Sequence, residues 1–336
     1  MVYLSFIYYY FGPVCFATYL AGLVLFKDKQ SVVDIFFLFF VLFLFAFHFY
    51  HHSFYFILYK ARFFFGFLSF YFYFKNYTIN IKRLLIFLVF LTLFEAVAIN
   101  TIVDASTLPN FPEKEKAMSH FAIVGHYQRP YSFAGNASVG SALIVALLSM
   151  SKVPTLIYIS SIFTVFVFAS GTGFLSLTLY FILNSWNFIR GHFIRFVLLL
   201  LIVALGLYYI GQSEYFSGSL VKISYKYYDY LIKFKLLQIN EAIFNRFSIF
   251  DYLLGYTGAT AIDDPAGDFG MLSYFFYYGV AGIIITGLII IRNLNKSNYK
   301  TVIILLVSSV HYPVIFFLPG QVIFAYALNY KKSLIK

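Results

Sequence analysis

Charged residues and cysteine are both scarce in this chain. Only 11% of its 336 residues are charged, whereas soluble domains are about a quarter charged, so a soluble globular core is excluded. The single cysteine, Cys15, cannot form an intrachain disulfide and belongs to no metal-site pattern. The first 26 residues contain no Lys or Arg, which predicts that there is no cleavable signal peptide. Walker, dinucleotide-binding and HExxH motifs are missing too.

Hydrophobic residues are abundant instead, at 62% of the chain. They form apolar stretches of about 20 residues, the length that a helix needs to cross a hydrocarbon core. Helices satisfy their backbone hydrogen bonds internally, which lipid requires. The sequence therefore predicts an all-α polytopic membrane protein with a single integral domain over residues 1–336 and about eleven transmembrane helices. We place these at residues 3–26, 31–50, 53–74, 84–99, 133–150, 153–169, 172–187, 196–211, 268–291, 301–318 and 319–330.

The net charge of +11 is explained by membrane topology, without a nucleic-acid partner. Short loops rich in Lys and Arg stay in the cytoplasm. With the N-terminus outside, the connections on the cytoplasmic side contain only one acidic residue, Asp28, beside many basic ones. Those connections are residues 27–30, 75–83, 151–152, 188–195, 292–300 and 331–336. This pattern predicts a multi-pass membrane protein with these connections in the cytoplasm.

Two long loops then fall outside the membrane, at residues 100–132 and 212–267. Within the second, one helical face carries Lys222, Lys226, Asp229 and Lys233, with apolar residues largely opposite. This pattern predicts an amphipathic helix in the membrane interface. Its lysines either reach the headgroups of membrane lipids or help to hold an anionic lipid substrate.

Three stretches carry motifs that membrane anchoring does not explain. Residues 126–136 read HYQRPYSFAGN and lead into an apolar helix, and residues 169–175 read ASGTGFL at an outer turn between helices. The third stretch begins with NRF at residues 245–247 and continues to Gly255. It is followed by DFG at 268–270 and GVAG at 279–282.

Together these stretches, in this order over about residues 120–290, resemble the bacterial O-antigen polymerase (Wzy) and O-antigen ligase superfamily. One departure is Gly171, where many members carry arginine, so no phosphate role of that arginine transfers here. The resemblance implies a metal-independent glycosyltransferase of the membrane GT-C type without a cofactor. It implies transfer of a growing glycan from undecaprenyl pyrophosphate onto the next lipid-linked oligosaccharide repeat, making O-antigen or capsule. A chain-length regulator is a further implied partner.

The chemistry needs cations for the leaving pyrophosphate and a base for the acceptor hydroxyl. Arg129 and Arg246 stand at the family-like positions, and arginine binds phosphate bidentately; ordinary surface or ion-pair roles are the alternative. The base is predicted to be His126 or Asp268, although His126 could simply be exposed and Asp268 could cap a helix. Further outer candidates are His120, Asp251, Asp263 and Asp264.

Ionisable groups inside apolar segments are costly and usually face a cavity or a partner. Lys60 and Arg62 could contact pyrophosphate or Glu95, unless residues 31–59 form one long helix that ends in a cytoplasmic turn. His311 could line the substrate cavity or bond a carbonyl freed by Pro313. These three groups complete the predicted binding residues.

Two other functions stay open. An O-antigen-ligase-type transferase would use a different acceptor, but residues 212–267 lack the histidine that such ligases are proposed to use. A lipid-linked oligosaccharide flippase or other transporter would often show internal repeats and discontinuous helices. We find no such repeat in the sequence, and a purely structural membrane protein would leave the motif order unexplained.

Overall fold

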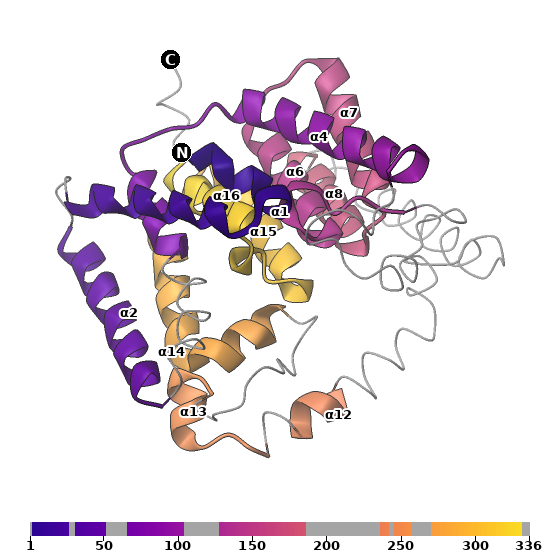
Figure 1. Cartoon of the computed structure of the whole chain (residues 1–336). Coiled ribbons are helices and arrows are strands. Elements are labelled where there is room, and N and C mark those ends of the chain that lie inside the picture. Colours follow the sequence, from indigo (N-terminus) through magenta and orange to yellow (C-terminus); the bar gives the residue numbers. More distant parts are fainter. Residues whose placement is uncertain are drawn as a thin grey trace. The chain divides into compact units, whose positions relative to one another are not determined.

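The computed structural model describes residues 2–26, 31–51, 66–103, 128–185, 236–241, 245–256 and 270–330. Within these residues all regular structure is helical and no strand occurs (Figure 1), which confirms the predicted all-α class. The predicted segment 196–211, most of segment 53–74 and the amphipathic stretch of the second loop lie outside the described residues.

The helices begin and end within a few residues of most predicted segments. Asn80, Asn136, Ser170 and Ser248 precede helices, and each accepts a hydrogen bond from the first turn through its side chain, as N-cap residues do. The elements are η1 (Val2–Ile7), α1 (Tyr8–Phe11), η2 (Gly12–Phe26), α2 (Val32–His51), α4 (Ile81–Thr101), η4 (Ser132–Ala134), α6 (Ala137–Met150), α7 (Thr155–Val167), α8 (Gly171–Asn184), α12 (Leu236–Ile239), α13 (Ile249–Leu254), α14 (Gly270–Asn293), α15 (Tyr299–His311), η8 (Val314–Phe316) and α16 (Leu318–Asn329).

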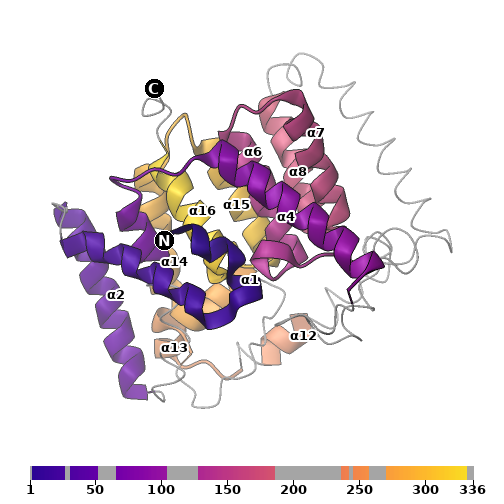
Figure 2. The same ribbon diagram turned by 45° about the horizontal axis from the view of Figure 1, so that its top comes forward.

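The chain packs as two compact units. The first contains Met1–Ile79 and Leu237–Lys336, and the second contains Asn80–Leu236. In the second unit, α4 crosses α6 and α7 (Figures 1 and 2), and α6 is the central helix, with every residue except Ser149 buried. The predicted single membrane domain stays a prediction.

In the first unit, α14 is interrupted at Gly279. This residue has φ 62° and ψ −165°, so the helical backbone breaks there. The break makes room for α13, because a Cβ at Gly279 would lie 2.5 Å from the backbone of Leu253. Gly255, at φ 94°, comes similarly close to the backbone of Tyr277. The predicted continuous helix 268–291 is therefore wrong in this respect, since it bends where the GVAG motif begins.

A second break lies near the C-terminus. The predicted segment 301–318 is divided at Tyr312, because the residue before a proline disfavours helical backbone and Pro313 follows. The chain then makes the short η8 turn and enters α16. The N-terminal segment 3–26 is helical as predicted, but mostly in 3-10 turns, with Pro13 near the junction of α1 and η2.

Polar side chains gather at one end of the first unit. Asp34, in the first turn of α2, is 2% exposed and forms an ion pair with Lys75. The carboxylate also accepts from Arg292 at 3.0 Å, and Ser31 bonds to it as well. Nearby, the buried Asn298 amide donates to the carbonyl of Ala327 at 3.0 Å, near the end of α16. Residues that flank connections 27–30, 75–83, 292–300 and 331–336 therefore meet at this end.

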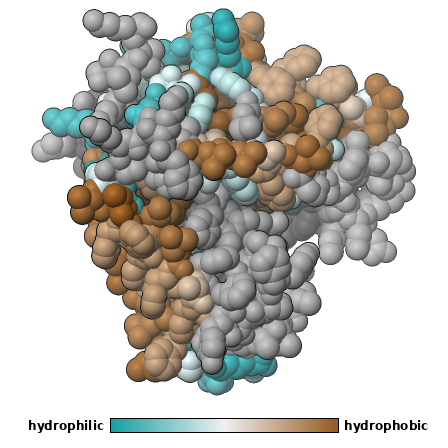
Figure 3. Space-filling model, turned by 60° about the vertical axis from the view of Figure 1, so that its left-hand side comes forward, coloured by the Kyte–Doolittle hydropathy of each residue, from teal (hydrophilic) through white to brown (hydrophobic). Residues whose placement is uncertain are grey.

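Two of the described helices, α4 and α14, are long and apolar enough to cross a membrane, judged by length and composition. The other apolar helices among the described residues are shorter, so the number of about eleven spans stays a prediction. Large hydrophobic side chains are nevertheless exposed, including Phe39 of α2 and Phe90 of α4, each 67% exposed. Figure 3 shows one such face, where brown hydrophobic residues cover much of the described surface.

Candidate functional site

Glu95 holds the chain segment that leads into α6. Its side chain is 4% exposed, and its Oε1 accepts hydrogen bonds from the backbone N–H groups of Tyr131 at 2.9 Å and Ser132 at 3.0 Å. Ser132 has φ 51°, a left-handed conformation that residues with a Cβ rarely adopt. The buried carboxylate of α4 therefore stabilises a strained turn in the predicted Arg-led motif.

Two further side chains of α4 fix the same segment. The Asn100 amide pairs with the backbone of Gln128 in both directions, donating to its carbonyl and accepting from its N–H, each at 2.8 Å. One helical turn before Glu95, the hydroxyl of Thr92 lies 2.7 Å from that of Ser132. Residues 128–132 are thus fastened to α4 on both sides of Arg129.

Arg129 itself is left without an acidic partner among the described residues. Its side chain is partly exposed, and its Cζ lies 5.9 Å from the centroid of the Tyr131 ring. Its Nε is buried and makes no hydrogen bond. A buried donor without a partner costs about 1–3 kcal/mol. The guanidinium therefore has no acidic partner among the described residues, and its partly exposed side chain is a candidate for binding an anion.

The first turns of α6 and α8 lie side by side. Because α7 runs back between them along the chain, both helices begin at the same end of this unit. The hydroxyls of Ser138 and Ser170 are 2.8 Å apart. A Cβ at Gly173 would lie 2.6 Å from the side chain of Ser141, so glycine permits the close approach. Two partial positive charges from helix N-termini are thereby brought together.

The start of α8 has polar groups whose hydrogen-bonding capacity is not fully used. Thr172 is 4% exposed, and its Oγ1 has no hydrogen-bond partner. The Ser170 hydroxyl accepts from the N–H of Gly173 only at 3.5 Å. A Cβ at Gly171, the first residue of α8, would meet no atom within 4 Å, so there is open space beside this residue. Such a helix start suits a phosphate-like anion, which prefers N–H and hydroxyl donors.

Arg246 lies in the first unit, at an exposed turn before α13. The next residue, Phe247, begins an aromatic cluster: its ring centroid is 5.5 Å from that of Tyr256 and 5.3 Å from that of Tyr252. Asp251, one of the alternative bases, is 4% exposed and forms a capping box with Ser248 at the start of α13. Its carboxylate is therefore engaged in stabilising that short helix.

His311 is the last residue of α15 and is partly exposed. Its ring stacks on that of Tyr312, with centroids 4.6 Å apart. It therefore lies within the predicted segment 301–318, at the point where α15 ends before Pro313.

The other predicted site residues are not placed. His126, Asp268, Lys60 and Arg62 lie outside the described residues, as do the alternatives His120, Asp263 and Asp264. Arg129 belongs to the second unit, whereas Arg246 and His311 belong to the first. Among the described residues, no group of three or more His, Cys, Asp or Glu side chains could hold a metal ion.

Sequence reasoning missed the hydroxyl groups of the second unit. Ser170 and Thr172 lie inside the second motif and Ser138 lies two residues after the first, but none of the three carries a charge that would mark it in the sequence. A usable signal was present, because Asn136 and Ser170 each stand directly before an apolar helix, as N-caps do. No protein-family model, curated protein or solved structure matches the chain. A functional proposal therefore rests on the arrangement of hydrogen-bond donors in the second unit.

Proposed function

We propose that this chain is a membrane glycosyltransferase that polymerises oligosaccharide repeat units for O-antigen or capsule. The growing glycan would leave undecaprenyl pyrophosphate and join the next lipid-linked repeat at the outer face of the bacterial inner membrane. A chain-length regulator would act with it. The lipid-linked oligosaccharide and the surrounding membrane lipids are the proposed partners.

The observation that carries the proposal is the meeting of the two motifs in the second unit. Residues 126–136 and 169–175 are far apart in the sequence, yet the hydroxyl of Ser138, two residues after the first motif, lies 2.8 Å from that of Ser170 in the second. Unpaired donors of Arg129 and Thr172 lie in those same motifs. This end of the unit therefore offers several donors that suit a phosphate group.

Those donors have a defined role in the proposed transfer. The acceptor hydroxyl would attack the anomeric carbon of the donor sugar while the bond from that carbon to the pyrophosphate oxygen breaks. Negative charge develops on the leaving pyrophosphate, where Arg129 and the start of α8 would stabilise it. The proton of the acceptor hydroxyl would pass to His126 or Asp268, and Arg246, Lys60, Arg62 and His311 are the further proposed substrate contacts.

The polar end of the first unit supports the proposed topology. Four connections predicted to be cytoplasmic are flanked by residues that meet there, around Asp34 and Asn298. Loops on one side of a membrane must lie at one end of a helical bundle. The charge pattern and the packing of this unit therefore agree on which helix ends belong together.

The deciding experiment uses purified protein in nanodiscs with the polyprenyl-pyrophosphate repeat unit of its host. Products are resolved by size, and a ladder spaced by one repeat is expected. Arg129→Ala should lower the rate about 10²–10³-fold, as the loss of one fixed transition-state donor does. Arg129→Lys should recover only part of it, because lysine keeps the charge but loses the fork.

The matched control is Arg83→Ala, which removes an exposed arginine from the first turn of α4 in the same unit. It should leave the ladder unchanged. A folded protein that makes no ladder with verified substrate would contradict polymerisation. A single transfer to a lipid A core acceptor would then favour the ligase.

One observation favours a transporter as the second candidate. Discontinuous helices line the substrate sites of many transporters, and the first unit has breaks at Gly279 and Pro313. Sealed proteoliposomes loaded with the lipid-linked repeat distinguish the two. Movement of the repeat across the bilayer without elongation would make the chain a flippase.

A further inference from the structure

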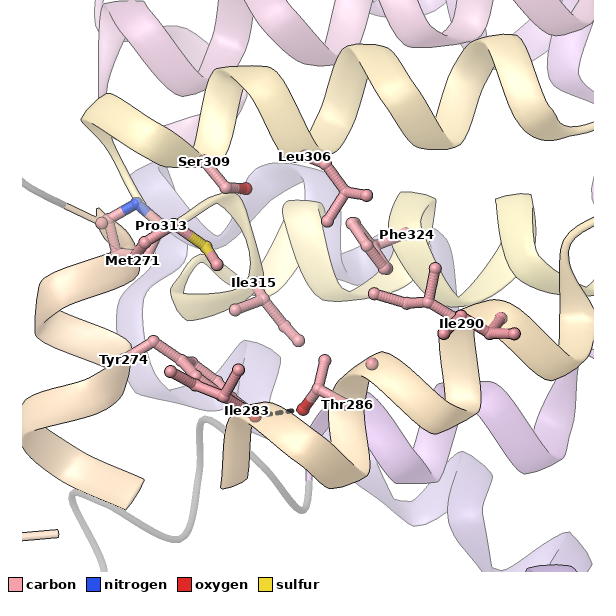
Figure 4. Close-up of a pocket in the computed structure, with 13 residues that line it drawn as sticks. Met271, Tyr274, Ile283, Thr286, Ile290, Leu306, Ser309, Pro313, Ile315 and Phe324 are labelled. Carbon is pink, nitrogen blue, oxygen red and sulfur yellow. Dashed lines mark hydrogen bonds between the residues drawn. The ribbon is translucent and has the colours of Figure 1, made fainter. Parts of the chain in front are cut away.

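The first unit contains an apolar cavity of about 280 Å³ that is open on one side. Figure 4 shows its walls: Met271 and Tyr274 before the break in α14, Ile283 and Ile290 after it, Leu306 of α15 and Phe324 of α16. Residues from both sides of the break at Gly279 line this space, together with residues of α15 and α16. All of them belong to the first unit.

The few polar groups on the cavity wall are already bonded to protein. The Tyr274 hydroxyl lies 2.5 Å from that of Thr286, the dashed contact in Figure 4. The Ser309 hydroxyl donates to the Leu305 carbonyl at 2.8 Å. A bound water needs two to four polar partners, and an apolar cavity of about 150 Å³ stays dry and binds benzene. The present cavity therefore suits a hydrocarbon rather than water.

The cavity also connects with an exposed apolar face. Met271 and Ile291 line it and are 42% and 72% exposed. Between these two residues on α14, Ile284 and Leu288 are 54% and 48% exposed. Because α14 is long and apolar enough to cross a membrane, these residues would face lipid. A hydrocarbon chain could enter from there without crossing water.

We propose that this cavity holds a fatty acyl chain of a membrane phospholipid. The wall offers no free group to recognise a headgroup or sugar, so the occupant is selected by its hydrocarbon alone. Phospholipid is the most concentrated source of hydrocarbon around a membrane protein, and mass action favours the abundant ligand. By comparison with benzene, the cavity takes a chain segment of about ten carbons. The proposal does not depend on the proposed glycosyltransferase activity.

Gly287 provides a way to fill the cavity. It lines the wall, and a Cβ there would meet no atom within 4 Å. Gly287→Phe should therefore occupy the space without displacing neighbours, whereas Gly287→Ala should leave most of it open. If Gly287→Phe does not fold, Leu306→Phe narrows the cavity from the opposite wall.

The test uses the full chain in nanodiscs of phosphatidylglycerol with a photoactivatable diazirine in one acyl chain. Crosslinks are mapped by mass spectrometry. We expect labelling at Met271, Ile283 and Leu306, at least fivefold weaker in the filled variant but unchanged in Gly287→Ala. Labelling of Phe90, 67% exposed on α4, is the internal control and should not change.

Three outcomes would overturn the proposal. One is labelling of Phe90 with none inside the cavity. Another is cavity labelling that survives in both filled variants, since the acyl chain would then lie elsewhere. The third is full displacement of the label by an equimolar polyprenyl phosphate, which would assign the cavity to an isoprenoid chain instead.

Discussion

The two units use a buried carboxylate in different ways. In the first, Lys75 and Arg292 both contact the buried carboxylate of Asp34, and Ser31 completes the cluster. In the second, the buried carboxylate of Glu95 accepts from backbone N–H groups, while the Nε of Arg129 has no hydrogen-bond partner. The first carboxylate is paired with cations, whereas the second positions a segment whose arginine has no acidic partner among the described residues.

This difference distinguishes a group of paired charges that stabilises the fold from a site that can bind a ligand. Burial lowers the pKa of Lys75 despite the opposing effect of Asp34, so the pairing mainly offsets the loss of water around the lysine. Such a cluster fixes how helices meet. An unpaired guanidinium contributes no comparable stability and is retained at a cost, which an anionic ligand would relieve. Substitutions in the two places should therefore affect different measurements.

Asp34→Asn should have the largest effect on stability. Removing one partner of a buried pair costs about 3–5 kcal/mol, and the partial exposure of Lys75 and Arg292 reduces this to about 2–3 kcal/mol. Denaturant unfolding of the purified protein in detergent measures the change. Lys82→Ala, at an exposed position in the first turn of α4, should stay within about 0.5 kcal/mol. An unchanged midpoint for Asp34→Asn would show that the cluster does not stabilise the fold.

Substitutions of Glu95 should have intermediate effects on stability. The size of the effect should depend on whether the new side chain can still accept hydrogen bonds. Glu95→Gln keeps an oxygen that can accept from Tyr131 and Ser132, so we expect a loss of about 1 kcal/mol as charge-assisted bonds become neutral ones. Glu95→Leu leaves two N–H groups unpaired and should cost about 2 kcal/mol, since each unpaired buried donor costs at least about 1 kcal/mol. The same unfolding assay compares the two variants. Equal losses would mean that the carboxylate does not hold the Arg129 segment through these bonds.

Much of the helical framework follows from the sequence. The N-caps Asn80, Asn136 and Ser170 stand before apolar runs, so α4, α6 and α8 begin close to where the pattern predicts. The breaks at Gly279 and Tyr312 were harder to predict. A lone glycine in an apolar run usually continues the helix, and only the approach of the α13 backbone explains the change of direction.

The candidate site was predictable only in part. Arg129 is an evident candidate because charged residues are rare in this chain. The resemblance to the polymerase and ligase superfamily points to the same residue. The contact between Ser138 and Ser170 is a tertiary event between helices that are not consecutive, which no local pattern encodes. Whether a hydroxyl such as that of Thr172 is bonded or free depends on its neighbours in three dimensions. Sequence patterns therefore identified the motifs but not the donors that they share.

Thr172→Val should have the smallest effect of these substitutions. It should also distinguish a loss of activity from a loss of stability most clearly. Valine keeps the shape of threonine and removes a buried hydroxyl that has no partner, so stability should stay the same or rise. Polymerisation should fall about tenfold, the loss of roughly 1.4 kcal/mol of transition-state stabilisation. Thr92→Val is the matched control, because the Thr92 hydroxyl is bonded to Ser132 at 2.7 Å; that change should cost about 1 kcal/mol of stability. If both variants lost stability alike and neither lost activity at equal folded protein, the unpaired hydroxyl of α8 would have no role in binding, and the proposed anion site would reduce to Arg129.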